Sequence, residues 1–423
     1  MKQSILIFSL FISTLGVAHE ASNLDHVIEK SLAFVAHGQH GENKQGGDPS
    51  LYWPGEWSVN MKSYFLPALL GVGRLWARPT QEPTSFATSS IVNLLSETYI
   101  LNPQYEQILD LISKGIKSTN HYADGDLYDF YNWDQFNHVQ VHAPKSSVYV
   151  PNFIRGLTNI PPDADTTSTT YMAKAYAESI FHHHSLSNFR IPNSVLTTLS
   201  LYRDINRMPH YYNYFDSIKN SGAFMTWFVD EKKMTRNIFA PPDKGARVPF
   251  GFNDVDCIVN ANILRLLTAT KNTQVPGYKE SCDLLNFVIE KDKQKQCGTY
   301  YPNSYAVFFT ISNAYKQGAS CLQSSRSKAI EFLLSHQNQD GSWSNEPGIG
   351  RTDQVQSTAL AVIALVNYTE ASGLQNPLAI HLAMDFLLSQ QKEKSSTEIY
   401  WPGEVFFSAV AQARNTVLWR SDI

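Results

Sequence analysis

The clearest pattern of apolar and polar positions along the chain lies in the segment Lys328–Trp343, KAIEFLLSHQNQDGSW. Phe332, Leu333 and Gln337 fall on one stripe of a helix. The Asp-Gly pair that follows is typical of the turn at which a helix ends, and Trp343 lies on that turn. The segment therefore predicts a helix that leads into a turn bearing a tryptophan.

Weaker copies of this unit recur along the chain. Each has a pair of apolar residues, a polar residue one turn later, and an aromatic residue after a turn. The copies are Phe34, Val35, Gln39 and Trp53; Phe287, Val288, Asp292 and Tyr300; and Phe386, Leu387, Gln391 and Trp401. The first and last copies lead into the same five residues, YWPGE, at 52–56 and 400–404. An internal repeat of this kind indicates an array of similar structural units.

A second, more apolar helix is expected after each turn, for example at Tyr64–Trp76, Tyr305–Tyr315 and Thr358–Tyr368. A helix that is apolar on nearly every side is buried on both sides, so charged outer helices should alternate with apolar inner ones. Such an array hides its open ends by closing into a ring. No strand pattern of comparable strength and no Ser/Gly linker divides the chain. The prediction is an all-α fold, a single (α/α) toroid of helix hairpins, formed by residues 19–423 as one domain. The chain ends at Ile423, where an inner helix is due, so the last hairpin is expected to be truncated.

Residues 1–18 have the features of a secretory signal peptide. Lys2 provides a positive charge, Ile5–Val17 is a short apolar run, and the small residues before His19 suit cleavage there. The run is too short to span a membrane, and no later segment stays apolar for long enough. We expect an exported protein, periplasmic or secreted; an uncleaved anchor is the alternative.

All four cysteines lie in one stretch of the C-terminal half: Cys257, Cys282, Cys297 and Cys321. An even number of cysteines in an exported chain predicts disulfides, with three connectivities open. Buried free thiols are the alternative.

Composition narrows the function classes. The formal net charge is -4 and no long basic block occurs, so nothing indicates nucleic-acid binding. Aromatic residues make up 12% of the chain, more than core packing needs, and would suit a wide aromatic-lined cavity. No Asp-Asp pair, Cys-x-x-Cys spacing or phosphate-binding glycine loop occurs, so no metal and no cofactor is predicted.

Two Asp-x-Asp motifs precede apolar helices, Asp163 and Asp165 in PDADTT and Asp254 and Asp256 in FNDVDCIVNANIL. In a third segment, TDQVQSTALAVIAL, Asp353 is in register with the first aspartate of each motif. Because the first aspartate recurs in every copy, we expect it to cap its helix. The second, at 165 and 256, is not required by the repeat and is the better candidate for function at the rim of the cavity. Helix stabilisation is the alternative for these two residues.

Four polar residues near Asp256 are candidate binding residues. Asn260 and Asn262 lie on the expected inner helix, where an amide must be hydrogen-bonded or face the cavity. Lys244 and Arg247 lie upstream and would hold an anionic group of a ligand. Solvated loop charges are the alternative for these two.

The pattern K-A-x-x-F-L-x-x-x-Q-x-x-x-G-x-W in Lys328–Trp343 resembles the QW repeat of squalene and oxidosqualene cyclases. These enzymes belong to a superfamily of α/α toroids that includes the protein prenyltransferase β subunits. The resemblance implies that the glutamine amide ties an outer helix to the turn bearing the tryptophan, a structural role.

The motif PDADTT is similar to the Asp-x-Asp-Asp motif of class II terpene cyclases, with Thr166 in place of the last aspartate. The resemblance implies that Asp165 is the acid that protonates an alkene or epoxide and that Asp163 flanks it. The function expected is acid-initiated chemistry on an apolar or isoprenoid-like ligand in the cavity. A secreted (α/α)-barrel carbohydrate-active enzyme with two rim carboxylates is one alternative. A non-catalytic module that binds lipid, peptide or glycan is the other.

Overall fold

The computed structural model describes residues 21–41, 52–63, 79–136, 139–142, 160–205, 220–230, 253–345, 354–370, 377–403, 405–411 and 416–422. Several expectations fall outside these residues and stay predictions. They concern the signal peptide at 1–18, the inner helix at Tyr64–Trp76, the cap at Asp353, and the binding residues Lys244 and Arg247.

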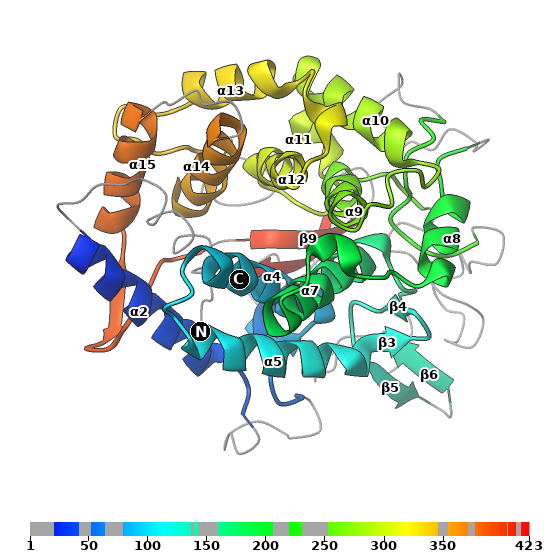
Figure 1. Cartoon of the computed structure of the whole chain (residues 1–423), viewed down its shortest axis with the longest axis horizontal. Coiled ribbons are helices and arrows are strands. Elements are labelled where there is room, and N and C mark those ends of the chain that lie inside the picture. Colours follow the sequence, from blue (N-terminus) through cyan, green and yellow to red (C-terminus); the bar gives the residue numbers. More distant parts are fainter. Residues whose placement is uncertain are drawn as a thin grey trace.

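Apolar inner helices lie side by side in chain order and form the inside of the ring (Figure 1). They are α4 (Ser85–Leu101), α7 (Ala164–His182), α9 (Cys257–Ala269), α12 (Tyr305–Lys316) and α14 (Gln354–Glu370). The outer helices are α2 (Ala21–Gly38), α5 (Gln107–Thr119), α8 (Asn193–Leu201), α10 (Tyr278–Glu290), α13 (Arg326–Ser335) and α15 (Pro377–Ser389). The short α11 (Gln294–Cys297) leads from α10 into α12. This alternation of outer and inner helices confirms the predicted (α/α) toroid.

The ring closes where the two ends of the chain meet. The hairpin of β7 (Lys392–Ser395) and β8 (Glu398–Tyr400) follows α15 and packs against α2. Phe34 of α2 stacks on Tyr400 with ring centroids 5.4 Å apart, and His37 Nδ1 lies 3.1 Å from Glu398 Oε1. Contacts between the first helix and the last hairpin therefore hold the described ring together.

A four-stranded antiparallel sheet also joins the two ends, in the order β2 (Pro79–Pro83), β1 (Ser58–Ser63), β10 (Thr416–Asp422) and β9 (Val405–Ala411). In agreement with the expected truncation of the last hairpin, strands and no inner helix occupy the described residues after the last YWPGE segment. The residues that follow it, VFFSAVA and TVLWRSD, are rich in β-branched and aromatic side chains, which favour strands once a partner such as β1 is available. Short pairs also form between β3 (Ala123–Asp124) and β4 (Leu127–Tyr128), and between β5 (Trp133–Phe136) and β6 (Val139–His142).

The best-conserved copy of the repeat has the structural role expected of it. Gln337 follows α13, and its Nε2 donates to the carbonyls of Gly341 at 3.1 Å and Ala379 at 2.7 Å. The amide thus ties the end of one outer helix both to its own turn and to the next outer helix. The indole of Trp343 is fully buried and donates from Nε1 to the carbonyl of Leu333 at 2.8 Å.

In the first copy the tryptophan equivalent to Trp343 is Trp57, so the assignment of Trp53 was wrong. Trp57 Nε1 donates to the carbonyl of Val35 at 2.9 Å, while Trp53 stacks on His121 with centroids 3.7 Å apart. The signal lies in the Gly-x-Trp spacing, which Gly55 and Trp57 share with Gly341 and Trp343. The identical YWPGE segments are therefore not structurally equivalent, because in the last copy Trp401 within the segment is the residue that donates to Leu387.

The four cysteines form two disulfides, which correspond to one of the three possible connectivities. Cys257 at the start of α9 pairs with Cys297 at the end of α11, and Cys282 of α10 pairs with Cys321. The alternative of free thiols is therefore wrong. Both bonds cross-link the segment from α9 to the residues before α13.

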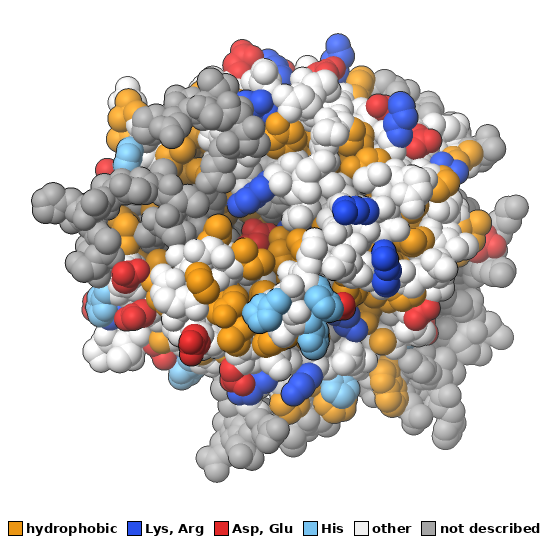
Figure 2. All heavy atoms as spheres, viewed as in Figure 1, with side chains coloured by type: hydrophobic (Ala, Val, Ile, Leu, Met, Phe, Trp, Pro, Cys, Tyr) orange, Lys and Arg blue, Asp and Glu red, His pale blue; other side chains and the backbone are white. Residues whose placement is uncertain are grey.

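The surface in Figure 2 carries lysine and arginine side chains that are scattered singly over its described part. Histidine side chains gather over α7, whose C-terminal end is followed by the exposed residues His183 and His184. Of the helices within the described ranges, none has the length and apolar character needed to cross a bilayer.

Candidate active site

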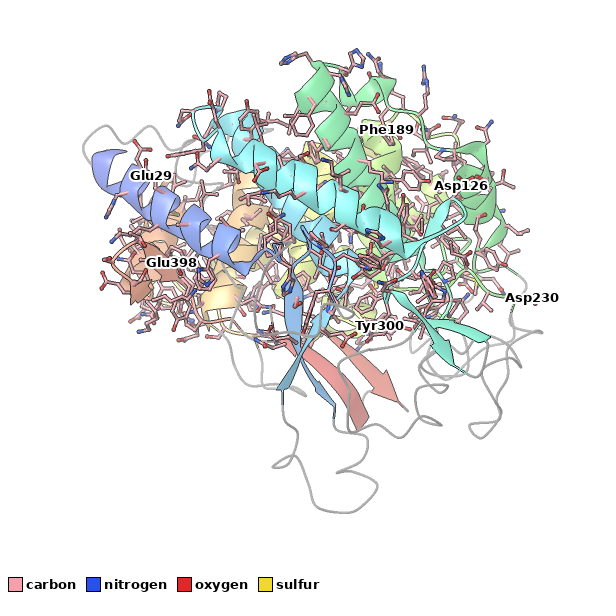
Figure 3. All side chains as sticks on the ribbon, turned by 90° about the horizontal axis from the view of Figure 1, so that it is seen from below. Glu29, Asp126, Phe189, Asp230, Tyr300 and Glu398 are labelled. Atoms are coloured by element: carbon pink, nitrogen blue, oxygen red, sulfur yellow. A yellow bond between two sulfur atoms is a disulfide. The ribbon has the colours of Figure 1, made fainter. Side chains whose placement is uncertain are left out.

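The N-terminal ends of α7 and α9 bring the two Asp-x-Asp motifs together at the end of the ring that also holds the four-stranded sheet. Tyr300, which contacts both Asp254 and Asp256, lies beside that sheet in Figure 3. Asp163 precedes α7, and its Oδ1 accepts a hydrogen bond from the N–H of Thr166 at 2.6 Å. The prediction that Asp163 caps its helix is confirmed.

Asp256, not Asp254, is the cap of α9. Its Oδ1 accepts from the N–H groups of Ile258 at 2.7 Å and Val259 at 3.3 Å. Its Oδ2 accepts from the N–H groups of Thr299 at 2.5 Å and Tyr300 at 3.2 Å. Because four backbone donors occupy this carboxylate, Asp256 stabilises the helix start and the turn before α12.

The expectation that Asp254 caps a helix is therefore wrong. Helix α7 begins after the first aspartate of its motif, whereas α9 begins after the second, so the two motifs are offset by two positions. Asp254 Oδ2 instead accepts a hydrogen bond from the hydroxyl of Tyr300 at 2.6 Å, and that hydroxyl accepts from Trp227 Nε1 at 2.9 Å.

Both carboxylate oxygens of Asp165 accept hydrogen bonds from side chains. The residue lies in the first turn of α7 and is 6% exposed. Its Oδ1 accepts from Asn262 Nδ2 at 2.7 Å, and its Oδ2 accepts from the hydroxyl of Tyr301. Burial raises the pKa of Asp165 to about 6, and the hydrogen bonds from Tyr301 and Asn262 oppose that rise because they stabilise the carboxylate.

Other buried acids surround Asp165. Burial, together with the charge of Asp165, raises the pKa of Asp163 to about 7. Burial and the charges of Asp254 and Asp165 raise the pKa of Asp256 to about 7. Burial raises the pKa of Asp129 to about 9, with smaller contributions from Asp124 and Asp163. Neighbouring buried carboxylates resist ionising together, so this end of the ring retains protons at neutral pH.

A cavity of about 60 Å³ lies between the inner helices, next to the two residues that hold the carboxyl group of Asp165. Asn262 and Tyr301, the two hydrogen-bond partners of Asp165, both line it. The other lining residues come from the inner helices α4, α7, α9 and α12 and from strand β9. They are Phe86, Ser90, Asn93, Leu94, Thr169, Met172, Ile258, Arg265, Phe309, Thr310, Asn313 and Phe406. The wall thus combines aromatic and aliphatic side chains with hydroxyl, amide and guanidinium groups.

The two asparagines of α9 have different roles. Asn260 is fully buried, and its amide exchanges hydrogen bonds with the backbone of Phe224, at 3.0 Å in each direction. Ser281 also donates to Asn260 Oδ1 at 2.7 Å. Asn260 therefore has a structural role, because it connects α9 to Phe224 and Ser281. Of the two asparagines, only Asn262 lines the cavity.

Sequence reasoning missed Tyr301 and Asp129. Tyr301 follows the aromatic position of a weak repeat copy, so an aromatic pair after the turn was the available signal. Asp129 is fully buried 3.1 Å from His142 Nδ1, and no pattern in the sequence marks it. Within the described ranges, no group of three or more His, Cys, Asp or Glu side chains is arranged to hold a metal ion.

No protein-family model matches the sequence, and no curated protein matches it. Solved structures do resemble it. A substituted form of the type II terpene cyclase MstE from Scytonema, in complex with its product merosterolic acid A, is 11% identical, with a TM-score of 0.51 over 89% of this chain and 82% of that one. A second substituted form of MstE, without ligand, is 12% identical, with a TM-score of 0.50 over 89% of this chain and 80% of that one.

Cellobiose 2-epimerase from Bacillus thermoamylovorans is similar to the same degree. It is 12% identical, with a TM-score of 0.50 over 92% of this chain and 90% of that one. At such identities the likeness concerns the fold alone, and the two enzymes differ in chemistry. By its fold, the chain is an (α/α) toroid that shares its architecture with a terpene cyclase and a sugar epimerase.

Proposed function

We propose that the protein is an acid-initiated cyclase or isomerase of an apolar, isoprenoid-like alkene, with Asp165 as the proton donor. The observation that carries this proposal is the environment of Asp165. Its carboxyl group is buried, its pKa is raised to about 6, and both residues that hold it line an aromatic cavity. A general acid needs a pKa near the working pH and a fixed orientation, and this site offers both.

The step begins with a protonated Asp165. Asn262 donates to one carboxyl oxygen and Tyr301 to the other, so the acidic proton occupies a remaining lone pair. The π electrons of the alkene take that proton to form a C–H bond, which leaves a carbocation on the substrate and a carboxylate on Asp165. The two hydrogen bonds stabilise this carboxylate and so favour the transfer. Loss of a proton from a carbon next to the final cation restores the proton count, and the product is an isomer of the substrate.

The cavity wall suits a cationic intermediate. Phe86, Phe309 and Phe406 line it, and the faces of aromatic rings attract cations. Tyr301 packs edge-on against Phe406 with centroids 5.8 Å apart.

The alternative of a carbohydrate-active enzyme with two rim carboxylates has less support. The candidate partner of Asp165 was Asp256, and four backbone N–H groups occupy its oxygens. A carboxylate in that state is poorly placed to act as a base or nucleophile. The sugar epimerase among the similar structures supports this alternative only through its fold.

We also propose that the protein works outside the cytoplasm. The sequence of residues 1–18 and the two disulfides, Cys257–Cys297 and Cys282–Cys321, support export to an oxidising compartment. Fractionation of cells that express the full chain tests this, and recovery of the uncleaved protein from the cytoplasm contradicts it.

The test of the reaction is turnover in D₂O of linear polyprenyl alcohols and hydrocarbons of increasing chain length. Protonation of the alkene predicts a cyclised or isomerised product that carries one deuterium from solvent. The variant Asp165→Asn should lose this product, while Asp385→Asn, an exposed change on outer helix α15, should retain it. Product formation by Asp165→Asn, or product without deuterium, contradicts the proposal. Tight binding without any turnover points to a binding module instead.

A further inference from the structure

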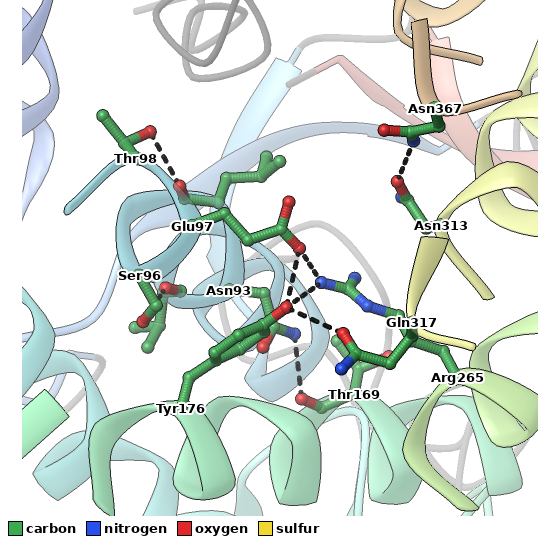
Figure 4. Close-up of polar contacts among 12 residues, drawn as sticks. Asn93, Ser96, Glu97, Thr98, Thr169, Tyr176, Arg265, Asn313, Gln317 and Asn367 are labelled. Atoms are coloured by element: carbon green, nitrogen blue, oxygen red, sulfur yellow. Dashed lines mark hydrogen bonds and ion pairs between the residues drawn. The ribbon is translucent and has the colours of Figure 1, made fainter. Parts of the chain in front are cut away.

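The polar end of the cavity is lined by side chains that the proposed acid chemistry does not use. They come from four inner helices: Asn93 from α4, Thr169 from α7, Arg265 from α9 and Asn313 from α12. Figure 4 shows Asn93 bonded to Thr169, Arg265 directed toward Glu97 and Tyr176, and Asn313 paired with Asn367. Along α7, the nearest of them, Thr169, lies one turn after Asp165, roughly 6 Å at 1.5 Å per residue.

The charge at this polar end is already balanced. Arg265 Nη2 pairs with Glu97 Oε1, and the hydroxyl of Tyr176 lies 3.2 Å from Nη2 and 3.1 Å from Glu97 Oε1. Burial lowers the pKa of Arg265 to about 10, which leaves the guanidinium protonated at neutral pH. Because Glu97 neutralises Arg265, a ligand that brought a negative charge here would add an uncompensated buried charge.

Several polar atoms at this end make no hydrogen bond within the described part of the chain. Asn93 is 4% exposed and Thr169 7% exposed, and both Asn93 Oδ1 and Thr169 Oγ1 are buried without a partner there. Asn93 Nδ2 donates to the carbonyl of Thr169 at 3.0 Å, which fixes the position of Asn93 Oδ1. Unpaired buried groups destabilise a protein, so their presence in a cavity wall indicates a partner supplied by a ligand.

Two other lining residues have donor groups for which no hydrogen bond is formed within the described part of the chain. Arg265 uses Nη2 for Glu97 and Tyr176, so Nε and Nη1 remain as donors beside the cavity. Asn313 uses Oδ1 to accept from Asn367 Nδ2 at 2.8 Å, so its own Nδ2 remains as a donor. The polar end therefore offers an acceptor on Asn93, donors on Arg265 and Asn313, and a hydroxyl on Thr169 that can do either.

We propose that Asn93, Thr169, Arg265 and Asn313 form a subsite for the uncharged hydroxyl group of an amphipathic ligand. A hydroxyl both donates and accepts, and so satisfies Asn93 Oδ1 together with a donor of Arg265 or Asn313. A carbonyl oxygen only accepts hydrogen bonds and so leaves Asn93 Oδ1 without a partner. A carboxylate would add a buried negative charge that no group here neutralises, because Glu97 already pairs with Arg265. This inference rests on the proposed function, because binding the hydroxyl here holds the ligand in the cavity next to Asp165.

The test measures binding in the Asp165→Asn protein, so that turnover does not interfere. The probes are geranylgeraniol, the hydrocarbon of the same chain that lacks the hydroxyl, and geranylgeranic acid, each measured by calorimetry. The alcohol should bind on the order of tenfold more tightly than the hydrocarbon, the ratio expected for one or two added hydrogen bonds. The acid, as its carboxylate, should bind more weakly than the alcohol.

Two threonines of the cavity wall provide a matched pair of variants. Thr169→Val removes a hydroxyl that has no partner within the described part of the chain, so the fold should keep its stability while the preference for the alcohol falls severalfold. Thr310→Val is the control, because Thr310 lines the same cavity but already donates to the carbonyl of Ala306 at 2.9 Å. The variant Asn93→Leu should remove the preference as well.

The outcomes separate this inference from the proposed function. Equal affinity for alcohol and hydrocarbon, tighter binding of the carboxylate, or equal effects of Thr169→Val and Thr310→Val overturn the hydroxyl subsite alone. Failure of both the alcohol and the hydrocarbon to bind overturns the subsite and the isoprenoid-like ligand together.

Discussion

The hydroxyl of Tyr301 donates a hydrogen bond to Oδ2 of Asp165, a residue 136 positions earlier in the chain. Tyr301 lies just before α12 and Asp165 in the first turn of α7, with α9 packed between these helices. Asn262 of α9 holds the other oxygen of the same carboxyl group. Three successive hairpins of the ring thus meet at a single acid.

The first prediction concerns the acid strength of Asp165. Tyr301→Phe keeps the aromatic ring and removes the hydrogen bond that lowers the pKa of Asp165. The pKa should therefore rise, and the fall of activity with increasing pH, which follows loss of the acidic proton, should move to higher pH. At low pH, where the acid is fully protonated, kcat should drop by roughly tenfold or more, since a hydrogen bond to a charged group is lost. A pH profile of kcat that does not shift would show that Tyr301 does not tune the acid.

The second prediction concerns stability and pH. The folded-state pKa of Asp163, at about 7, lies above its ordinary value of 3.8, so the folded protein binds this proton more tightly than the unfolded chain does. The contribution of Asp163 to the free energy of unfolding is then largest below pH 4 and is lost as the pH rises through about 7. Asp163→Asn keeps the capping oxygen and removes the charge. It should raise the thermal midpoint at pH 8 and flatten its dependence on pH between 4 and 8, whereas an unchanged slope would contradict this assignment.

The third prediction concerns Gly341, which lies in the turn of the most complete repeat copy. This turn packs closely against the next outer helix, α15. Gly341 has a φ of +84°, and a Cβ there would lie 2.2 Å from the carbonyl oxygen of Leu382 on α15. Gly341→Ala should therefore cost several kcal/mol of stability, measured by denaturant unfolding. Gly125→Ala is the control, because Gly125 also has a positive φ, of +60°, but nothing lies within 4 Å of its Cβ position, so about 1 kcal/mol is expected. Equal losses for the two variants would argue that conformation, and not the contact with α15, restricts residue 341.

Some of these structural features could be predicted from the sequence and others could not. The scaffold was predictable because Phe332, Leu333 and Gln337 act within one helix and its turn, where local spacing decides the structure. The pairing of β10 with β1 could not be predicted, because it joins segments from the two ends of the chain and no local pattern specifies it. The reversal of the roles expected for Asp254 and Asp256 has another cause. A cap is set by the residue at which a helix starts, and two identical Asp-x-Asp motifs start their helices at different residues.

The candidate site was predictable only in part for a similar reason. Asp165 stood out by its motif, but its partners Asn262 and Tyr301 come from other hairpins, 97 and 136 residues away. Contacts of that range depend on how the inner helices pack, and no single-chain pattern encodes them. The sequence therefore predicted Asp165 as the candidate acid, while its environment became known only from the fold.

The fourth prediction concerns the size of the cavity. At roughly 10–15 Å³ per water, a cavity of about 60 Å³ holds a few water molecules, so a larger ligand must displace side chains of the wall. Phe406 is the residue of that wall that lies on a strand, β9, and its ring packs against Phe86 and Tyr301. Phe406→Ala should enlarge the cavity and shift the preferred polyprenyl alcohol to a longer chain, measured as kcat/KM or affinity across a series of chain lengths.

The neighbouring Phe407 supplies the control for this change. Phe407 also lies on β9 and packs against Phe130, with centroids 5.1 Å apart, but it is not part of the cavity wall. Phe407→Ala should therefore lower stability without changing the preferred chain length, because it removes packing outside the space that the ligand fills. If both variants shift the preference equally, the effect comes from loosening β9. If neither does, the ligand enters elsewhere, and the strands formed by the end of the chain serve only to close the ring.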